Sequence, residues 1–64
     1  MEILQFFEYT HLPSDLQMVS YPFHQVAHQI DVSLPDNSEK EMALRKLLEA
    51  RDCAVRSTIM KSVQ

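Results

Sequence analysis

The chain has 64 residues, no glycine, no tryptophan, one cysteine and a formal charge of −3. This length allows one small domain, residues 1–64, and excludes Rossmann, P-loop and barrel enzymes, which need far more chain. The absence of glycine excludes a Gly-rich phosphate loop, and the acidic balance argues against general DNA or RNA binding. No apolar run approaches the ~20 residues of a membrane span, so we expect no membrane partner.

Charge is distributed unevenly along the chain. Residues 1–39 carry six acidic residues and no lysine or arginine, whereas residues 40–64 carry all six basic residues and three acidic ones. The two parts therefore have formal charges of −6 and +3, which sum to −3. A small anionic ligand could bind only where the few basic residues converge.

The N-terminal half is predicted to contain an arm and two helices. Residues 1–13 form an apolar, aromatic opening that predicts an extended arm, followed by a short helix over 14–19 capped by Ser14. Ser20 and Pro22 are start signals for a helix over 20–34. Its buried face is predicted from helical spacing to contain Phe23, Val26, Ala27, Ile30 and Leu34.

The C-terminal half is predicted to be one long helix over 38–61. Ser38 and Glu41 match a capping box, and the buried stripe contains Leu44, Leu47, Leu48, Arg51, Ala54, Val55 and Ile59. A short turn makes two consecutive helices antiparallel, so the predicted fold is an all-α two-helix hairpin preceded by an arm. Because each helix of a lone hairpin buries only one stripe, we expect a homo-oligomer.

Two groups of residues could carry catalytic or metal chemistry. His24 and His28 stand four residues apart with Asp31 one turn further, a spacing that could hold a metal ion. There is no HExxH motif, however, so surface histidines are favoured, with His24 a donor to an anion. Cys53 lacks basic neighbours that would activate it and is interpreted as an inert thiol of a reduced, intracellular protein. We expect no catalytic residue, metal or cofactor.

The arginines and aromatic residues are the candidates for binding. Arg45 and Arg56 have carboxylates at helical spacing, Glu49 and Asp52, so ordinary surface pairs explain them. Arg51 interrupts the apolar stripe and must reach solvent, an acidic group or a ligand. The aromatic residues near turns could stack on a base, although packing in a core or interface is the commoner role.

Four pieces of the sequence together resemble a known family. They are residues 7–13 (FEYTHLP), 16–23 (LQMVSYPF), 34–35 (LP) and 43–56 (ALRKLLEARDCAVR). They are similar to the helical-hairpin domain of bacteriophage anti-CBASS cyclic-oligonucleotide sponges, which is shared with Thoeris anti-defence sponge proteins. The resemblance covers about residues 6–57.

The resemblance implies a non-enzymatic viral protein in the cytoplasm of the infected bacterial host. Such proteins assemble as dimers and hexamers and sequester cyclic dinucleotides and trinucleotides between protomers without cleaving them. Carried over by position, Arg56 would bind the phosphates of a trinucleotide, with Arg51 nearby. The dinucleotide site would use the remaining ligand-binding candidates, Phe7, Tyr9, His11, Ser20, Tyr21 and His24.

Two departures from the family pattern bear on the ligand. Relatives often carry a lysine where Tyr21 or His24 stands, so recognition of a dinucleotide here would shift towards histidine and backbone donors. The chain also lacks the β-rich domain of the Thoeris proteins, which argues against binding of their cyclic ADP-ribose signals; these signals are kept as an alternative ligand class. A second alternative is a structural oligomerisation or adaptor module that binds a host protein.

Overall fold

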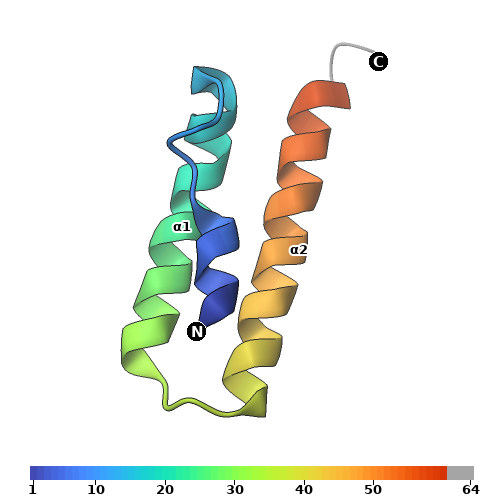
Figure 1. Ribbon diagram of the computed structural model, residues 1–64. Helices are drawn as coiled ribbons and strands as arrows, with labels where there is room; N and C mark the ends of the chain where they lie inside the picture. Colours follow the sequence, from blue (N-terminus) through green and yellow to red (C-terminus); the bar gives the residue numbers. More distant parts are fainter. Residues whose placement is uncertain (61–64) are drawn as a thin grey trace.

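The computed structural model describes residues 1–60 and consists there of three helical elements. They are a 3-10 helix η1 (Glu2–Phe7) and two α-helices, α1 (Ser14–Ser33) and α2 (Ser38–Met60). Figure 1 shows α1 and α2 side by side and antiparallel, with η1 lying along the groove between them. The predicted all-α class and the packed pair of helices are confirmed. The predicted end of the second helix, at residue 61, lies outside the described residues.

The N-terminal arm is helical over Glu2–Phe7, so the prediction of an extended arm over 1–13 was wrong for this part. Phe7 is only 1% exposed, and Ile3 and Leu4 pack against the same core. In a 3-10 helix positions 4 and 7 lie one above the other and position 3 lies on the adjacent side, and burying these side chains against both helices selects the helical form. The remainder of the arm is a turn in which Leu12 N donates to Tyr9 O over 3.0 Å.

Helix α1 runs without a break through Pro22, whereas the sequence predicted two helices, over 14–19 and 20–34. Pro22 removes only the hydrogen bond that would reach the carbonyl of Met18, and the strongly exposed position of Met18 leaves that carbonyl accessible to water. A continuous stripe of side chains that face the core along the helix stabilises the fold by more than the lost hydrogen bond. It consists of Leu16, Ser20, Phe23, Ala27 and Ile30.

Ser20 lies in that stripe, and therefore does not cap a helix. Its side chain is 1% exposed and its Oγ has no hydrogen-bond partner. Ser20→Ala is expected to stabilise the fold by about 1 kcal/mol, because it removes an unsatisfied buried hydroxyl and improves helix propensity. Thermal unfolding at matched protein concentration measures this change, and a lower Tm than that of the wild type would contradict it.

The turn between the helices is closed by Lys40 and Asn37. Asn37 caps α2, since its Oδ1 accepts from Lys40 N at 2.9 Å; the cap therefore lies one residue before the predicted Ser38. The Lys40 side chain is 3% exposed, and its Nζ donates to the carbonyls of Asp31 (2.9 Å) and Leu34 (3.1 Å). The same ammonium is paired with Asp31 Oδ1 (3.1 Å) and Asp36 Oδ1 (2.6 Å). A cation thus closes the C-terminus of α1.

The core of the described residues is small. Phe7, Ala27 and Leu44 are buried, and Phe23, Leu47 and Leu48 are among the residues packed against them. Three residues of the predicted buried faces remain exposed: Val26, Leu34 and Ile59. Within residues 1–60, neither helix combines the length and apolar character that a membrane crossing requires.

Candidate functional site

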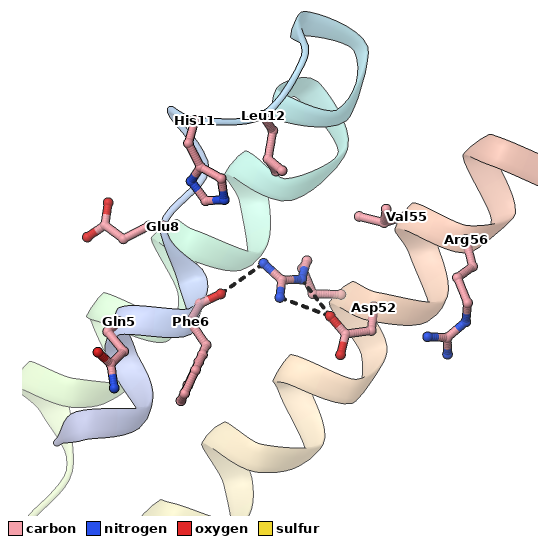
Figure 2. A pocket seen from close by; sticks show the side chains of 9 residues that line it. Gln5, Phe6, Glu8, His11, Leu12, Asp52, Val55 and Arg56 are labelled. Atoms are coloured by element: carbon pink, nitrogen blue, oxygen red, sulfur yellow. Dashed lines mark hydrogen bonds and ion pairs between the residues drawn. The ribbon is translucent and has the colours of Figure 1, made fainter.

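One hollow of about 480 Å³ lies between the arm and the second half of α2 (Figure 2). We refer to it as the arginine hollow. The arm contributes Gln5, Phe6, Glu8, His11 and Leu12. Helix α2 contributes Arg51, Asp52, Val55 and Arg56. Two arginines, two acidic residues, one imidazole and apolar side chains therefore meet at a surface that neither the arm nor α2 forms alone.

Arg51 has its donors engaged within the protein. Its Nη1 donates to Phe6 O at 3.0 Å, and its Nε donates to Asp52 Oδ1 at 2.9 Å. Nη2 is also 2.9 Å from that oxygen, and the side chain is 15% exposed. Arg51 therefore fixes η1 on α2 and forms a wall of the hollow, with its charge balanced by Asp52.

Arg56 also lines the hollow from α2, and Figure 2 shows its guanidinium pointing away from the arm. Asp52, its predicted partner, pairs with Arg51, while Arg45 pairs with Glu41 at 3.2 Å and not with Glu49. Within residues 1–60, Arg56 is in no ion pair with a carboxylate; its Nη2 donates only to Cys53 Sγ, at 3.2 Å. An exposed guanidinium without a carboxylate partner is suited to binding an anion.

A second group of rings gathers on the outer side of α1. We call Tyr9, Tyr21, His24 and His28 the aromatic patch. The ring centroids of Tyr9 and Tyr21 are 5.3 Å apart, those of Tyr9 and His24 are 4.9 Å apart, and both pairs meet edge to face. His24 and His28 lie 4.4 Å apart with a tilt of 53°. With Gln25, Val26 and Gln29, these rings line an open hollow of about 640 Å³, the aromatic hollow.

The arm sets the orientation of this patch. His24 Nδ1 lies 3.1 Å from Phe7 O, and because a carbonyl only accepts, this nitrogen is the donor. The Oη atom of Tyr21 accepts from Gln25 Nε2 at 2.8 Å, which leaves the hydroxyl proton of Tyr21 free to be donated elsewhere. The contact with Phe7 thus ties the rings of α1 to η1.

The eight predicted ligand-binding residues fall into three places. His11, Arg51 and Arg56 line the arginine hollow. Tyr9, Tyr21 and His24 line the aromatic hollow. Phe7 and Ser20 are buried, so they support the site from inside and their side chains do not face either hollow. His11 is thereby grouped with the arginines, whereas the sequence pattern groups it with Tyr9.

Sequence reasoning missed three residues that matter here. Phe6 carries the carbonyl that Arg51 binds, across 45 positions of the chain, and no local pattern reports such a contact. Helical spacing assigns Asp52 to Arg56, although it pairs with Arg51. His28 is interpreted from the sequence as a surface histidine or a metal ligand and not as part of a ring cluster, although its spacing from His24 also indicates neighbouring rings.

The structure gives no support to a metal centre within residues 1–60, where no group of three or more His, Cys, Asp or Glu is arranged to hold an ion. Asp31, the carboxylate of the hypothetical site, is bound to Lys40. Comparison with family models, with curated proteins and with solved structures found no match to this chain.

Proposed function

We propose that this protein is a viral anti-defence sponge that binds cyclic oligonucleotide immune signals without cleaving them and so prevents activation of CBASS effectors. The proposal joins the resemblance of residues 6–57 to such sponges with the chemistry of the two hollows. A sponge needs ring faces for bases, donors for phosphates and no reactive group. Its place of action would be the cytoplasm of the infected bacterium.

The observation that carries the proposal is the state of Arg56. Of the two arginines at the arginine hollow, Arg51 is neutralised by Asp52, while Arg56 is in no ion pair with a described carboxylate. Arg56 is also the residue that the resemblance assigns to the phosphates of a cyclic trinucleotide. The resemblance and the charge pairing therefore favour the same side chain by separate arguments.

The aromatic patch supports the second part of the proposal, a site for cyclic dinucleotides. Its rings already meet edge to face, so the neighbouring side chains restrain one another and less conformational freedom is lost when a base stacks on them. Gln25 and Gln29 at the same hollow offer further hydrogen-bonding groups. Recognition there would depend on stacking and on donors other than lysine and arginine.

Exposed apolar side chains favour a homo-oligomer as the binding form. Large hydrophobic residues that remain exposed include Met18, Val26, Val32, Leu34 and Ile59, of which Val32 is 83% exposed. Such residues on so small a chain are suited to contact with further copies. Pockets shared between protomers would then enclose ligands that one open hollow cannot surround.

The direct test is isothermal titration of the purified protein against cyclic dinucleotides, cyclic trinucleotides and cyclic ADP-ribose, with the oligomeric state measured by light scattering. We expect binding of at least one cyclic oligonucleotide and recovery of that ligand intact by mass spectrometry. Absence of binding by an assembled protein would refute the proposal. Binding of cyclic ADP-ribose alone would assign the protein to Thoeris signals.

Tyr9→Ala is expected to weaken binding of a cyclic dinucleotide about tenfold or more, since a base stacked on an aromatic ring contributes about 1–3 kcal/mol. Binding of a cyclic trinucleotide should change little, because Tyr9 does not line the arginine hollow. Titration of both ligands against the same preparation measures the contrast. An equal loss for both would indicate damage to assembly and not loss of a stacking contact.

The second candidate function is a structural adaptor that binds a host protein. The exposed apolar residues favour it too, since Phe6 is 55% exposed beside two arginines. A pull-down that returns one stoichiometric host protein, from material free of nucleotide, would favour this function over the sponge.

A further inference from the structure

The aromatic hollow has no permanently charged group on its lining. The titratable residues that line it are Tyr9, Tyr21, His24 and His28, and none of its lining residues is Asp, Glu, Lys or Arg. Residues 1–39, which include this whole surface, contain no lysine or arginine at all. Any positive charge that one chain offers to an anion in this hollow must therefore come from an imidazole.

The hydrogen bond of His24 determines what its ring offers. Nδ1 carries a proton because it donates to Phe7 O, so in the neutral ring Nε2 holds a lone pair. A lone pair repels a phosphate oxygen. When the ring gains a second proton, Nε2 becomes a charged donor, while the bond to Phe7 O is kept. Protonation thus converts His24 from repulsive to attractive without a rearrangement of the arm.

His28 lies where it can complete a binding site for one anion. Its ring centroid is 4.4 Å from that of His24 on the same helix face. Tyr21 is at the same hollow, and its hydroxyl proton is free because its oxygen accepts from Gln25. Two imidazolium rings so close together repel each other, and a bound anion relieves that repulsion.

We propose that His24 and His28, with the hydroxyl of Tyr21, form a proton-gated site for a phosphodiester whose base stacks on the aromatic patch. The inference rests on the proposed function, because it assigns the phosphate donors of the dinucleotide site. Binding of an anion at this site tightens when the imidazole rings gain a second proton, as acid pH favours. Binding at Arg56 does not share this dependence, because a guanidinium stays charged.

The surrounding groups do not supply a competing charge. On α1, Asp31 is one turn beyond His28 but is bound to Lys40, the α2 residue that reaches this end of the helix. The arm provides the carbonyl of Phe7, and Glu8 is not among the residues that line the aromatic hollow. Both imidazoles therefore face a hollow whose other lining groups are neutral.

The test uses 3′,5′-cyclic AMP, a single nucleotide whose phosphodiester charge stays constant across this pH range, with adenosine as the ligand that lacks phosphate. Titration at pH 7.5 and pH 5.5 is expected to show about tenfold tighter binding of cyclic AMP at the lower pH, the scale of one hydrogen bond from a charged donor. Ring ¹⁵N signals of His24 and His28 should shift on binding. Adenosine should bind with the same affinity at both pH values.

Substitutions separate this site from the rest of the protein. His28→Gln should reduce the pH effect on cyclic AMP, and Tyr21→Phe should weaken binding at both pH values. His11→Gln, a histidine of the arginine hollow, should leave the pH effect unchanged. A tightening that persists in His28→Gln, or an affinity independent of pH, would overturn the proton gate. In that case the proposed function would still be supported if the wild type binds a cyclic trinucleotide and Arg56→Ala does not.

Discussion

Replacement of Arg56 by alanine is expected to weaken binding of a cyclic trinucleotide by about tenfold to a hundredfold, the scale of a hydrogen bond to a charged group. The guanidinium is in no ion pair with a described carboxylate, so its removal leaves no protein charge stranded. Its donation to Cys53 Sγ is a weak contact. The loss should therefore appear in binding and not in folding. Isothermal titration with the trinucleotide, beside a thermal melt, measures both.

Arg45→Ala is the matched control for this prediction. Arg45 lies on the same helix, is exposed and is paired with Glu41 away from the arginine hollow. The variant Arg45→Ala should bind the trinucleotide with the affinity of the wild type, apart from a small effect of the changed net charge. Equal affinity in Arg56→Ala and Arg45→Ala would remove Arg56 from the site. Arg51→Ala is different, because it would release η1 from α2 and is expected to lower the Tm.

Replacement of Lys40 by methionine is expected to lower the Tm by at least about 5 °C. The change leaves the carbonyls of Asp31 and Leu34 without the donor that closes the C-terminus of α1. It also leaves the half-buried carboxylate of Asp31 without its cation. Lys46→Met, at an exposed position of the same helix, is the control and should change the Tm little.

The effect of Lys40 should also depend on pH in a defined way. The hydrogen bond from Lys40 lowers the pKa of Asp36 below its ordinary 3.8, and the same bond raises the pKa of Lys40 above 10.5. The lowered pKa of Asp36 stabilises the fold above about pH 4, and this stabilisation is lost as pH falls through the pKa of Asp36 in the folded state. The raised pKa of Lys40 stabilises the fold below about pH 10.5, and this stabilisation is lost as pH rises through the pKa of Lys40 in the folded state.

The Tm difference between the wild type and Lys40→Met is therefore expected to be constant from about pH 5 to pH 9 and to shrink towards acid and alkaline pH. Melting curves across this range, at one protein concentration, measure the profile. A difference that keeps its full size at pH 2 would show that the hydrogen bonds to carbonyls, and not the ion pair with Asp36, account for the effect.

Helical periodicity is sufficient to predict most of the architecture. The spacing of Ala27, Ile30, Leu44 and Leu47 marks the faces along which α1 and α2 meet, because a repeat of three and four residues is a local property of a helix. The short connection makes the two helices antiparallel for the same local reason. Periodicity and the short turn together therefore place the candidate residues of both helices on one small hairpin.

Local signals failed where a distant contact outweighed them. Ser20 and Pro22 look like a helix start, but a continuous stripe that packs against α2 and η1 is worth more than one lost hydrogen bond. The pattern of the arm predicts extension because no local partner for Phe7 is visible in it. In the fold Phe7 enters the core, and burial of its side chain selects the helical turn.

The sequence by itself determined that this is a small helical hairpin with aromatic residues in its acidic half and arginines in its basic half. Only the tertiary structure decided how those residues divide between two hollows. Helical spacing alone assigns Asp52 to Arg56, whereas in the fold Asp52 pairs with Arg51, whose guanidinium also binds the carbonyl of Phe6 on the folded arm. The physical reason is that a charge pairs with whichever partners the whole chain places around it, and this leaves the charge of Arg56 available for an anion.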